Sequence, residues 1–98
     1  MRCKRGVSLE GLLRCMTPVL IAGETIYGEH GAEFVITCHK KGIHSPGSKH
    51  YCGKALDLRT RDFKKKDLEK VVKEIRTLLG ISFTVILEKD HIHVQYDY

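Results

Sequence analysis

Five residues in two parts of the chain have the types and spacing that metal-assisted hydrolysis needs. His50 and Asp57 lie near the middle of the sequence, and His93 lies close to its C-terminal end. Two imidazoles and one carboxylate can bind a zinc ion and leave its fourth position open to water, which distinguishes a catalytic zinc site from a closed structural one. Glu88 and His91, next to the last ligand, would supply the proton transfers. These residues predict a small hydrolase that binds one zinc ion (Zn2+).

The end of the sequence predicts a β-hairpin that gathers part of this set. Two strand-like runs, 83–88 and 91–96, are separated by only two residues, Lys89 and Asp90. A two-residue turn places Glu88 directly opposite the first residue of the second strand, so both share a face. Strand alternation adds the second histidine of that strand to the same face and sends the aliphatic residues to the other. A polar trio of this kind is costly to bury unless it binds something.

Asp57 is expected on a second strand, over 55–59, with its two leucines toward the core. His50 and Asp57 are seven residues apart, so they cannot share a face of one regular strand. Gly53 resolves this by allowing a bend between a loop-end histidine and a strand-borne aspartate. Ala55 shares a face with Asp57, and its small side chain leaves room for a metal or substrate.

The remaining elements follow from apolar spacing and from turn residues. They are a helix over 9–16 capped by Ser8, a helix over 18–30 ended by Gly31, a buried strand over 34–38, a loop over 39–49, and a helix over 68–79 ended by Gly80. Together with the hairpin they predict a small single α+β domain, spanning residues 1–98, with helices packed on an antiparallel sheet.

The composition restricts the partners of this domain. The formal net charge of +5 suits an anionic partner, such as nucleic acid, anionic lipid or an anionic cell-wall polymer. No aromatic residues are interleaved with the basic ones, and the run 64–66 is expected to be a solvated helix start, so no nucleic-acid partner is predicted. The longest apolar run, 19–22, is too short for membrane insertion. We expect a monomer that is synthesised in the cytoplasm without a signal peptide.

Two motifs in this order resemble those of a known enzyme family. It comprises the zinc D-Ala-D-Ala carboxypeptidases and peptidoglycan endopeptidases, which include phage endolysins and share a fold with the Hedgehog signalling domain. The resemblance covers roughly residues 33–96. The motifs are Ser48-x-His50-x-x-Gly53-x-Ala55-x-Asp57 and His91-x-His93.

The resemblance implies a role for each matching residue. The zinc ligands would be His50, Asp57 and His93. Glu88 matches the catalytic acid/base, His91 matches a catalytic position beside the metal, and the Ser48 hydroxyl would support the first ligand or contact substrate.

The resemblance also implies the substrate and the setting. A zinc-bound water would attack a peptide bond of a peptidoglycan stem peptide, with D-Ala-D-Ala carboxypeptidase and endopeptidase activity both open. The protein would act on the cell wall, as phage endolysins do, after release from the cytoplasm by a holin.

The chain departs from the family in one respect. Many members carry an arginine in the loop before the first motif, where it binds the peptide or stabilises the oxyanion. The corresponding region, 37–44, has no arginine. Lys41 or His44, or the adjacent His39 and Lys40, would have to bind substrate instead.

Two other interpretations are kept open. A domain of this fold can hold zinc as a non-enzymatic recognition module, and the missing arginine favours that reading. A structural metal knuckle is disfavoured, because its spacing matches no regular arrangement of ligands. Its ligands would be drawn from Cys38, His39, His44, His50 and Cys52.

Overall fold

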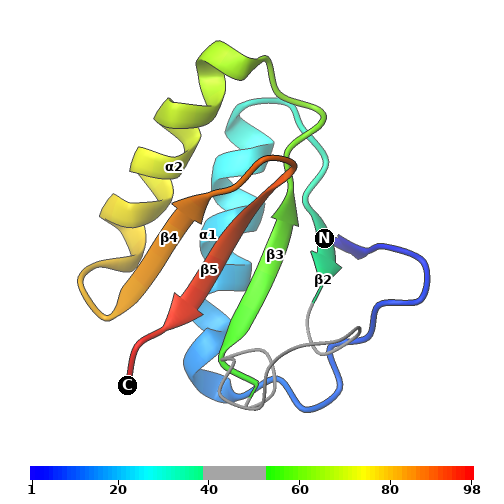
Figure 1. Ribbon diagram of the computed structural model, residues 1–98, viewed down its shortest axis with the longest axis vertical. Helices are drawn as coiled ribbons and strands as arrows, with labels where there is room; N and C mark the ends of the chain where they lie inside the picture. The colour runs from blue at the N-terminus through cyan, green and yellow to red at the C-terminus, as the bar shows by residue number, and fades with distance from the viewer. Residues whose placement is uncertain (39–52) are drawn as a thin grey trace.

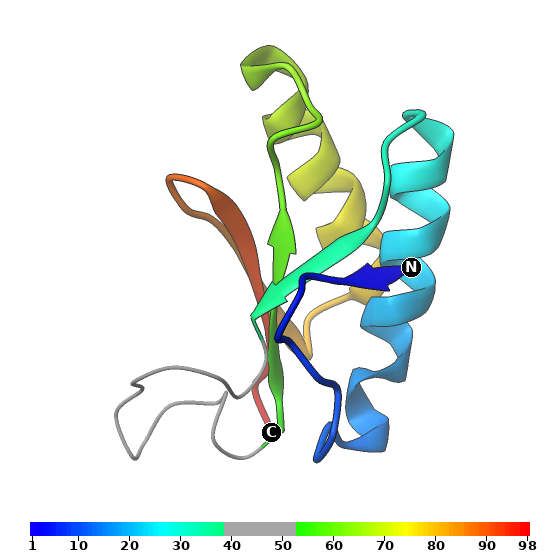
Figure 2. The same ribbon diagram turned by 90° about the vertical axis from the view of Figure 1, so that its right-hand side faces the viewer.

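The two α-helices in the part of the chain that the structure describes lie on the same face of a β-sheet (Figures 1 and 2). The computed structural model describes residues 1–38 and 53–98. Within them the elements are, in chain order, β1 (Arg2–Cys3), the 3-10 helix η1 (Arg14–Met16), α1 (Thr17–Glu29), β2 (Val35–Cys38), β3 (Ala55–Arg59), α2 (Lys65–Leu79), β4 (Phe83–Leu87) and β5 (His91–Tyr96). The expected α+β class, with helices packed on a sheet, is confirmed.

The sheet is mixed, whereas an antiparallel sheet was expected. Its five strands have the order β1-β2-β3-β5-β4 in the described residues, and β1 pairs with β2 in parallel while the other neighbours are antiparallel. Backbone hydrogen bonds from Arg2 to Phe34 (2.9 Å) and from Lys4 to Ile36 (2.8 Å) hold the N-terminal segment against β2. A strand of two residues is too short to show a periodic pattern, so the sequence did not predict it.

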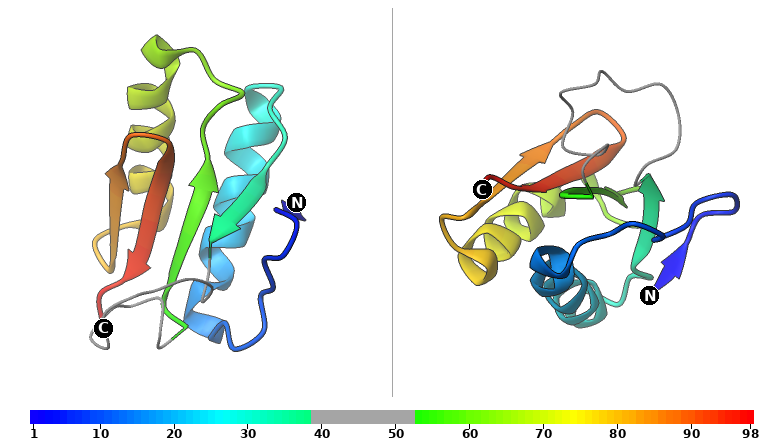
Figure 3. Two further views of the ribbon diagram at one scale, coloured as in Figure 1. Left: turned by 45° about the vertical axis from the view of Figure 1, so that its right-hand side comes forward. Right: turned by 90° about the horizontal axis from the view of Figure 1, so that it is seen from below.

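The sheet face that packs against the helices carries the core. On β3 and β5 this face consists of Leu56, Leu58, Ile92 and Val94, all with no exposed surface, and we call it the covered face. Figure 3, seen from below, shows α1 and α2 packed side by side beneath it. Burying each such aliphatic side chain contributes about 1.5–3 kcal/mol relative to leaving it exposed.

Both long helices were predicted, with small differences at their ends. Pro18 lies in the first turn of α1, where its missing N–H costs nothing. The chain leaves α1 and α2 through Gly31 and Gly80, whose φ angles of 70° and 80° suit glycine. Lys64 to Lys66 are exposed at the start of α2, as expected of a solvated helix end.

The prediction of a helix after Ser8 is wrong. Only the 3-10 turn Arg14–Met16 forms there, and Gly11 has a φ of 83° that an α-helix does not admit. Ser8 does not cap a helix, since its hydroxyl accepts only a local hydrogen bond from the Glu10 N–H (3.1 Å). The Leu13 N–H instead donates to the Gly53 carbonyl (3.1 Å), which ties this segment to the start of β3.

The C-terminal hairpin has the predicted turn and register. The Glu88 N–H donates to the His91 carbonyl (2.8 Å), and Ile86 faces His93 across the pair. Because hydrogen-bonded pairs alternate along an antiparallel ladder, the Val85 carbonyl then points away from β5. Two N–H groups of Arg76 on α2 donate to that carbonyl, at 3.0 and 2.7 Å.

Hydropathy adds one further observation. Neither helix in the described parts of the chain combines the length and apolar character needed to cross a membrane.

Candidate metal and catalytic site

Asp57 and His93 meet in the middle of the sheet face that points away from the helices. They are direct cross-strand partners on β3 and β5, and Asp57 Oδ1 lies 3.0 Å from His93 Nδ1. Alternation along the two strands adds Arg59, His91 and Gln95 to the same face, which we call the polar face. The sequence predicted that both strands would turn these residues away from the core, and their pairing brings the two proposed ligands into contact.

A chain of hydrogen bonds fixes which ring nitrogen of His93 carries a proton. Gln95 donates from its amide nitrogen to Asp97 (3.0 Å), which in turn accepts from the Thr84 hydroxyl (2.7 Å). The Gln95 amide oxygen therefore faces His93 Nε2 at 2.8 Å and accepts its proton. In neutral His93 the lone pair then lies on Nδ1, which faces the carboxylate of Asp57.

Two acceptors that face each other at this distance require a cation between them. Without a metal that cation is a proton: the hydrogen bond to Asp57 raises the pKa of His93, with a further contribution from Gln95 and against a lowering by burial. Tetrahedral zinc with ligands at 2.0–2.1 Å has them about 3.3 Å apart, close to the separation seen here. The described pair thus fits two corners of a zinc site, and Gln95 is placed to orient one ligand.

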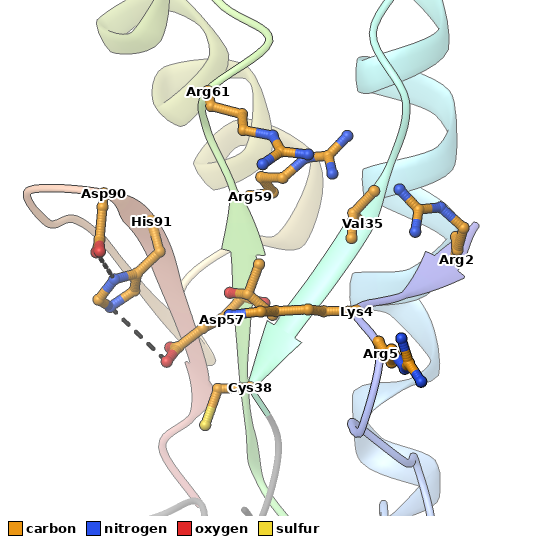
Figure 4. Close-up of a pocket in the computed structure, with 11 residues that line it drawn as sticks. Arg2, Lys4, Arg5, Val35, Cys38, Asp57, Arg59, Arg61, Asp90 and His91 are labelled. Carbon is orange, nitrogen blue, oxygen red and sulfur yellow. Dashed lines mark hydrogen bonds and ion pairs between the residues drawn. The ribbon is translucent and has the colours of Figure 1, made fainter.

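His91 lies beside Asp57 and points toward it (Figure 4). Its Nε2 is 3.7 Å from Asp57 Oδ2, and its Nδ1 is 2.7 Å from Asp90 Oδ1. That hydrogen bond lowers the pKa of the Asp90 carboxyl, which is ionised and accepts the Nδ1 proton. The hydrogen bond to Asp90 leaves Nε2 as the ring nitrogen of His91 that faces Asp57.

Glu88 lies at the end of the hairpin, exposed to solvent. Its register opposite His91 puts it on the polar face, as predicted, and its charge is among the smaller causes that raise the pKa of His93. It is not among the described residues that line the cavity below. An acid/base at this position would approach Asp57 and His93, the two proposed metal ligands, from the solvent-exposed end of the hairpin.

A β-bulge in β2 brings two more side chains to Asp57. The register shifts between Ile36 and Cys38, which lets both Thr37 and Cys38 reach the polar face. The Thr37 hydroxyl donates to the Asp57 carbonyl (3.4 Å). Burial first, then the charge of Asp57 and a hydrogen bond to it, raise the pKa of the Cys38 thiol, which therefore stays protonated. A bulge leaves no clear pattern in four residues, so this contact could not be predicted from the sequence.

Gly53 and Ala55 differ in how well the structure supports the roles expected of them. Gly53 has a φ of 75°, consistent with the expected bend, and a Cβ there would lie 2.2 Å from the Gly11 carbonyl oxygen. Ala55 is fully buried and is not among the described residues of the cavity.

Several predicted site residues lie outside the described residues. They are the ligand His50 and the substrate-binding candidates Ser48, Lys41 and His44. All residues of the disfavoured knuckle except Cys38 fall there too. Within residues 1–38 and 53–98, no group of three or more His, Cys, Asp or Glu side chains is arranged to hold a metal ion.

A cavity of about 710 Å³ opens next to Asp57 and His91, between β5 and the N-terminal segment. This volume is within the range of small-molecule sites in proteins. The described residues that line it, drawn in Figure 4, are Arg2, Lys4, Arg5, Val35, Thr37, Cys38, Asp57, Arg59, Arg61, Asp90 and His91.

Comparison of the chain with models of known protein families, with characterised proteins and with solved structures found no match. The function is therefore inferred from the residues of the site and from their spacing in the sequence.

Proposed function

We propose that this protein is a zinc-dependent peptidase of the D-Ala-D-Ala carboxypeptidase and peptidoglycan endopeptidase type, with the fold of that group and of the Hedgehog domain. The observation that carries the proposal is the Asp57–His93 pair, whose facing acceptor atoms lie 3.0 Å apart beside a cavity. The two motifs in the sequence, to which both residues belong, also support it. Its substrate class is the peptide bond of a peptidoglycan stem peptide.

His50, Asp57 and His93 would hold the zinc. Bound zinc polarises a carbonyl group and lowers the pKa of water toward about 7. The protein contributes the orientation of the ligands, because Gln95 fixes the His93 ring through its Nε2 proton (2.8 Å).

Glu88 and His91 would move the protons of the reaction. Glu88 takes a proton from the attacking water and returns it to the leaving amine. His91 has its Nδ1 proton held by Asp90 at 2.7 Å, so its Nε2 faces the site and, when protonated, donates a hydrogen bond to the developing oxyanion. The exposed place of Glu88 at the rim suits a group that must reach both water and leaving amine.

The proposed setting is the bacterial cell wall. The net charge of +5 favours an anionic wall polymer over a neutral one. A cytoplasmic protein of this kind would reach the wall after release by a holin.

Digestion of purified peptidoglycan tests the proposal. The zinc content of the protein is measured by plasma mass spectrometry, and released muropeptides are identified by mass spectrometry with and without a chelator. We expect one zinc per chain and a single type of cleaved peptide bond. Glu88→Gln should abolish cleavage and keep the zinc, whereas the matched control Glu69→Gln, an exposed glutamate on α2, should cleave at the normal rate.

Three outcomes contradict parts of this proposal. Cleavage that survives complete removal of the metal would exclude the zinc mechanism. Full activity of Glu88→Gln would exclude Glu88 as the acid/base. Stoichiometric zinc without hydrolysis of any muropeptide would favour the non-enzymatic recognition module.

A further inference from the structure

Basic residues are concentrated on the side of the cavity that the N-terminal segment and the end of β3 form. Lys and Arg make up 17 of the 98 residues of the chain but five of the eleven described residues that line this cavity. These five are Arg2, Lys4, Arg5, Arg59 and Arg61, and we call them the cationic wall. Figure 4 shows them along the β1 and β3 side, with Asp90 and His91 on the opposite side.

Two separate parts of the chain build the cationic wall. Alternation in β3 carries Arg59 to the same face as Asp57, and Arg61 continues this two-residue period just beyond the strand. The N-terminal segment contributes the rest, because its pairing with β2 turns Cys3 toward the core and the flanking Arg2 and Lys4 away from it. None of these five residues belongs to the two motifs of the proposed metal site.

The five cations fall into two groups by their partners. Arg2 and Arg59 are paired with carboxylates: both contact Glu33, at 2.8 and 3.3 Å, and Arg59 also contacts Asp62 at 2.8 Å. The other three, Lys4, Arg5 and Arg61, are not among the ion pairs formed in the described residues. The ion pairs hold Arg2 and Arg59 in place. The charges of Lys4, Arg5 and Arg61 are available to a ligand.

The opposite side of the cavity limits what this ligand can be. Asp57 and Asp90 are carboxylates, so a long polyanion such as a nucleic acid would be repelled on that side of the cavity. No aromatic side chain is among the described lining residues, so bases have no stacking platform there. A ligand with one anionic group at the cationic wall and a neutral amide at Asp57 and His91 matches both sides.

We propose that Lys4, Arg5 and Arg61 form an anion subsite that binds a free carboxylate of the peptide substrate, while the scissile bond lies at the Asp57–His91 side. The identity of the substrate rests on the proposed function, but the binding of an anionic peptide does not. The subsite would supply the arginine that residues 37–44 lack, from parts of the chain outside that region. Lys and Arg both pair with carboxylates, and arginine can do so through two hydrogen bonds.

The experiment removes the three cations together and measures binding and cleavage separately. The variant is Lys4→Gln, Arg5→Gln, Arg61→Gln. The control is Lys66→Gln, Lys70→Gln, Lys73→Gln, which removes the same charge from exposed positions on α2, on the far side of the sheet. Binding of a muropeptide with free carboxylates, and of the same peptide with its carboxylates converted to amides, is measured by calorimetry in a Glu88→Gln background. Values of kcat and KM are measured without that substitution.

We expect the cavity variant to bind the free-carboxylate peptide about tenfold more weakly, the sum of three exposed charge contacts. Its KM should rise by the same factor with kcat unchanged. The amide peptide should bind both proteins equally weakly, and the control variant should match the unsubstituted protein. Circular dichroism spectra that agree among the three proteins will show that these exposed substitutions preserve the fold.

Three results would overturn the subsite. They are equal affinity for the carboxylate and amide peptides, equal losses in the cavity and control variants, or a DNA duplex that binds more tightly than the peptide through the same three residues. Carboxylate-dependent binding that needs these residues, with no peptide cleaved, would reject the proposed peptidase and keep the subsite. Equal cleavage of the free-carboxylate and amide peptides would keep the proposed peptidase and reject the subsite.

Discussion

The two faces of the sheet are built from alternate residues of the same strands, and they differ in almost every physical property. On the covered face of β3 and β5, four aliphatic side chains have no exposed surface. On the polar face, hydrogen bonds join a carboxylate, an imidazole and an amide, those of Asp57, His93 and Gln95. A shift of one residue in the register of β3 against β5 would exchange the two faces. The core therefore fixes the register that brings Asp57 and His93 together.

The difference suggests that stability and chemistry can be changed independently. Substitutions on the polar face should affect metal binding and activity with little effect on the free energy of unfolding. Substitutions on the covered face should have the opposite effect.

Asp57→Asn should have the largest effect of any single change. An amide keeps the shape and a hydrogen bond to His93 but binds zinc poorly, so zinc should be lost and hydrolysis should fall by at least about a thousandfold. The free energy of unfolding of the metal-free protein should change by no more than about 1 kcal/mol. Zinc content, muropeptide cleavage and urea unfolding measure the three quantities. A large loss of stability would show that the polar face also holds the fold.

Leu58→Ala should have the largest effect on the covered face. Removing this fully buried side chain leaves a cavity beneath β3 and should lower the free energy of unfolding by about 2–5 kcal/mol. Urea denaturation measures the loss. The protein that remains folded should still bind one zinc per chain, and a folded fraction that no longer binds zinc would mean that the two faces are coupled.

Gln95→Ala should weaken zinc binding by about 10–100-fold, because His93 loses the acceptor that orients its ring. Competition with a fluorescent chelator measures this affinity. Thr84→Val removes only the hydroxyl that donates to Asp97, at the far end of the same hydrogen-bond chain, and should weaken zinc binding less. Equal effects of the two variants would argue that the chain acts through general stability and not through orientation.

A pair of glycines in α1 offers the smallest and most closely matched test. A Cβ on Gly23 would lie 2.2 Å from the Phe34 ring, whereas a Cβ on Gly28 would meet nothing within 4 Å. Gly23→Ala should therefore destabilise the fold by about 1–3 kcal/mol. Gly28→Ala should stabilise it by about 0.4–1 kcal/mol, since alanine favours the helix. Thermal unfolding distinguishes the two signs, and zinc binding should be unchanged in both variants.

The sequence predicted the elements whose pattern is local. Alternation in residues 55–59 and 91–96 assigned the faces of β3 and β5, and the two-residue turn at Lys89 and Asp90 fixed the register of the hairpin. The pairing of Asp57 with His93 follows from those assignments once β3 and β5 become neighbours. That neighbour relation joins residues 36 apart in sequence, and the family resemblance was its only indication in the sequence.

The parts that were missed depend on distant contacts. Leu9, Leu12, Leu13 and Met16 have helical spacing, but the positive φ of Gly11 and the hydrogen bond from Leu13 to residue 53 replace the helix. The cationic wall was missed for a similar reason. The sequence predicted a substitute for the missing arginine only among residues 39–44, whereas the N-terminal segment brings Arg2, Lys4 and Arg5 to the cavity from the other end of the chain.

Arg76 has a consequence for how copies of this protein meet one another. The outer edge of β4 presents backbone groups with which a strand from another molecule could pair. Such pairing is how sheets begin to aggregate edge to edge. The Val85 carbonyl, at the middle of that edge, is already occupied by two N–H groups of Arg76. An incoming strand would have to displace a guanidinium anchored on α2 before it could pair there, so the helix that completes the core also protects the edge of the sheet.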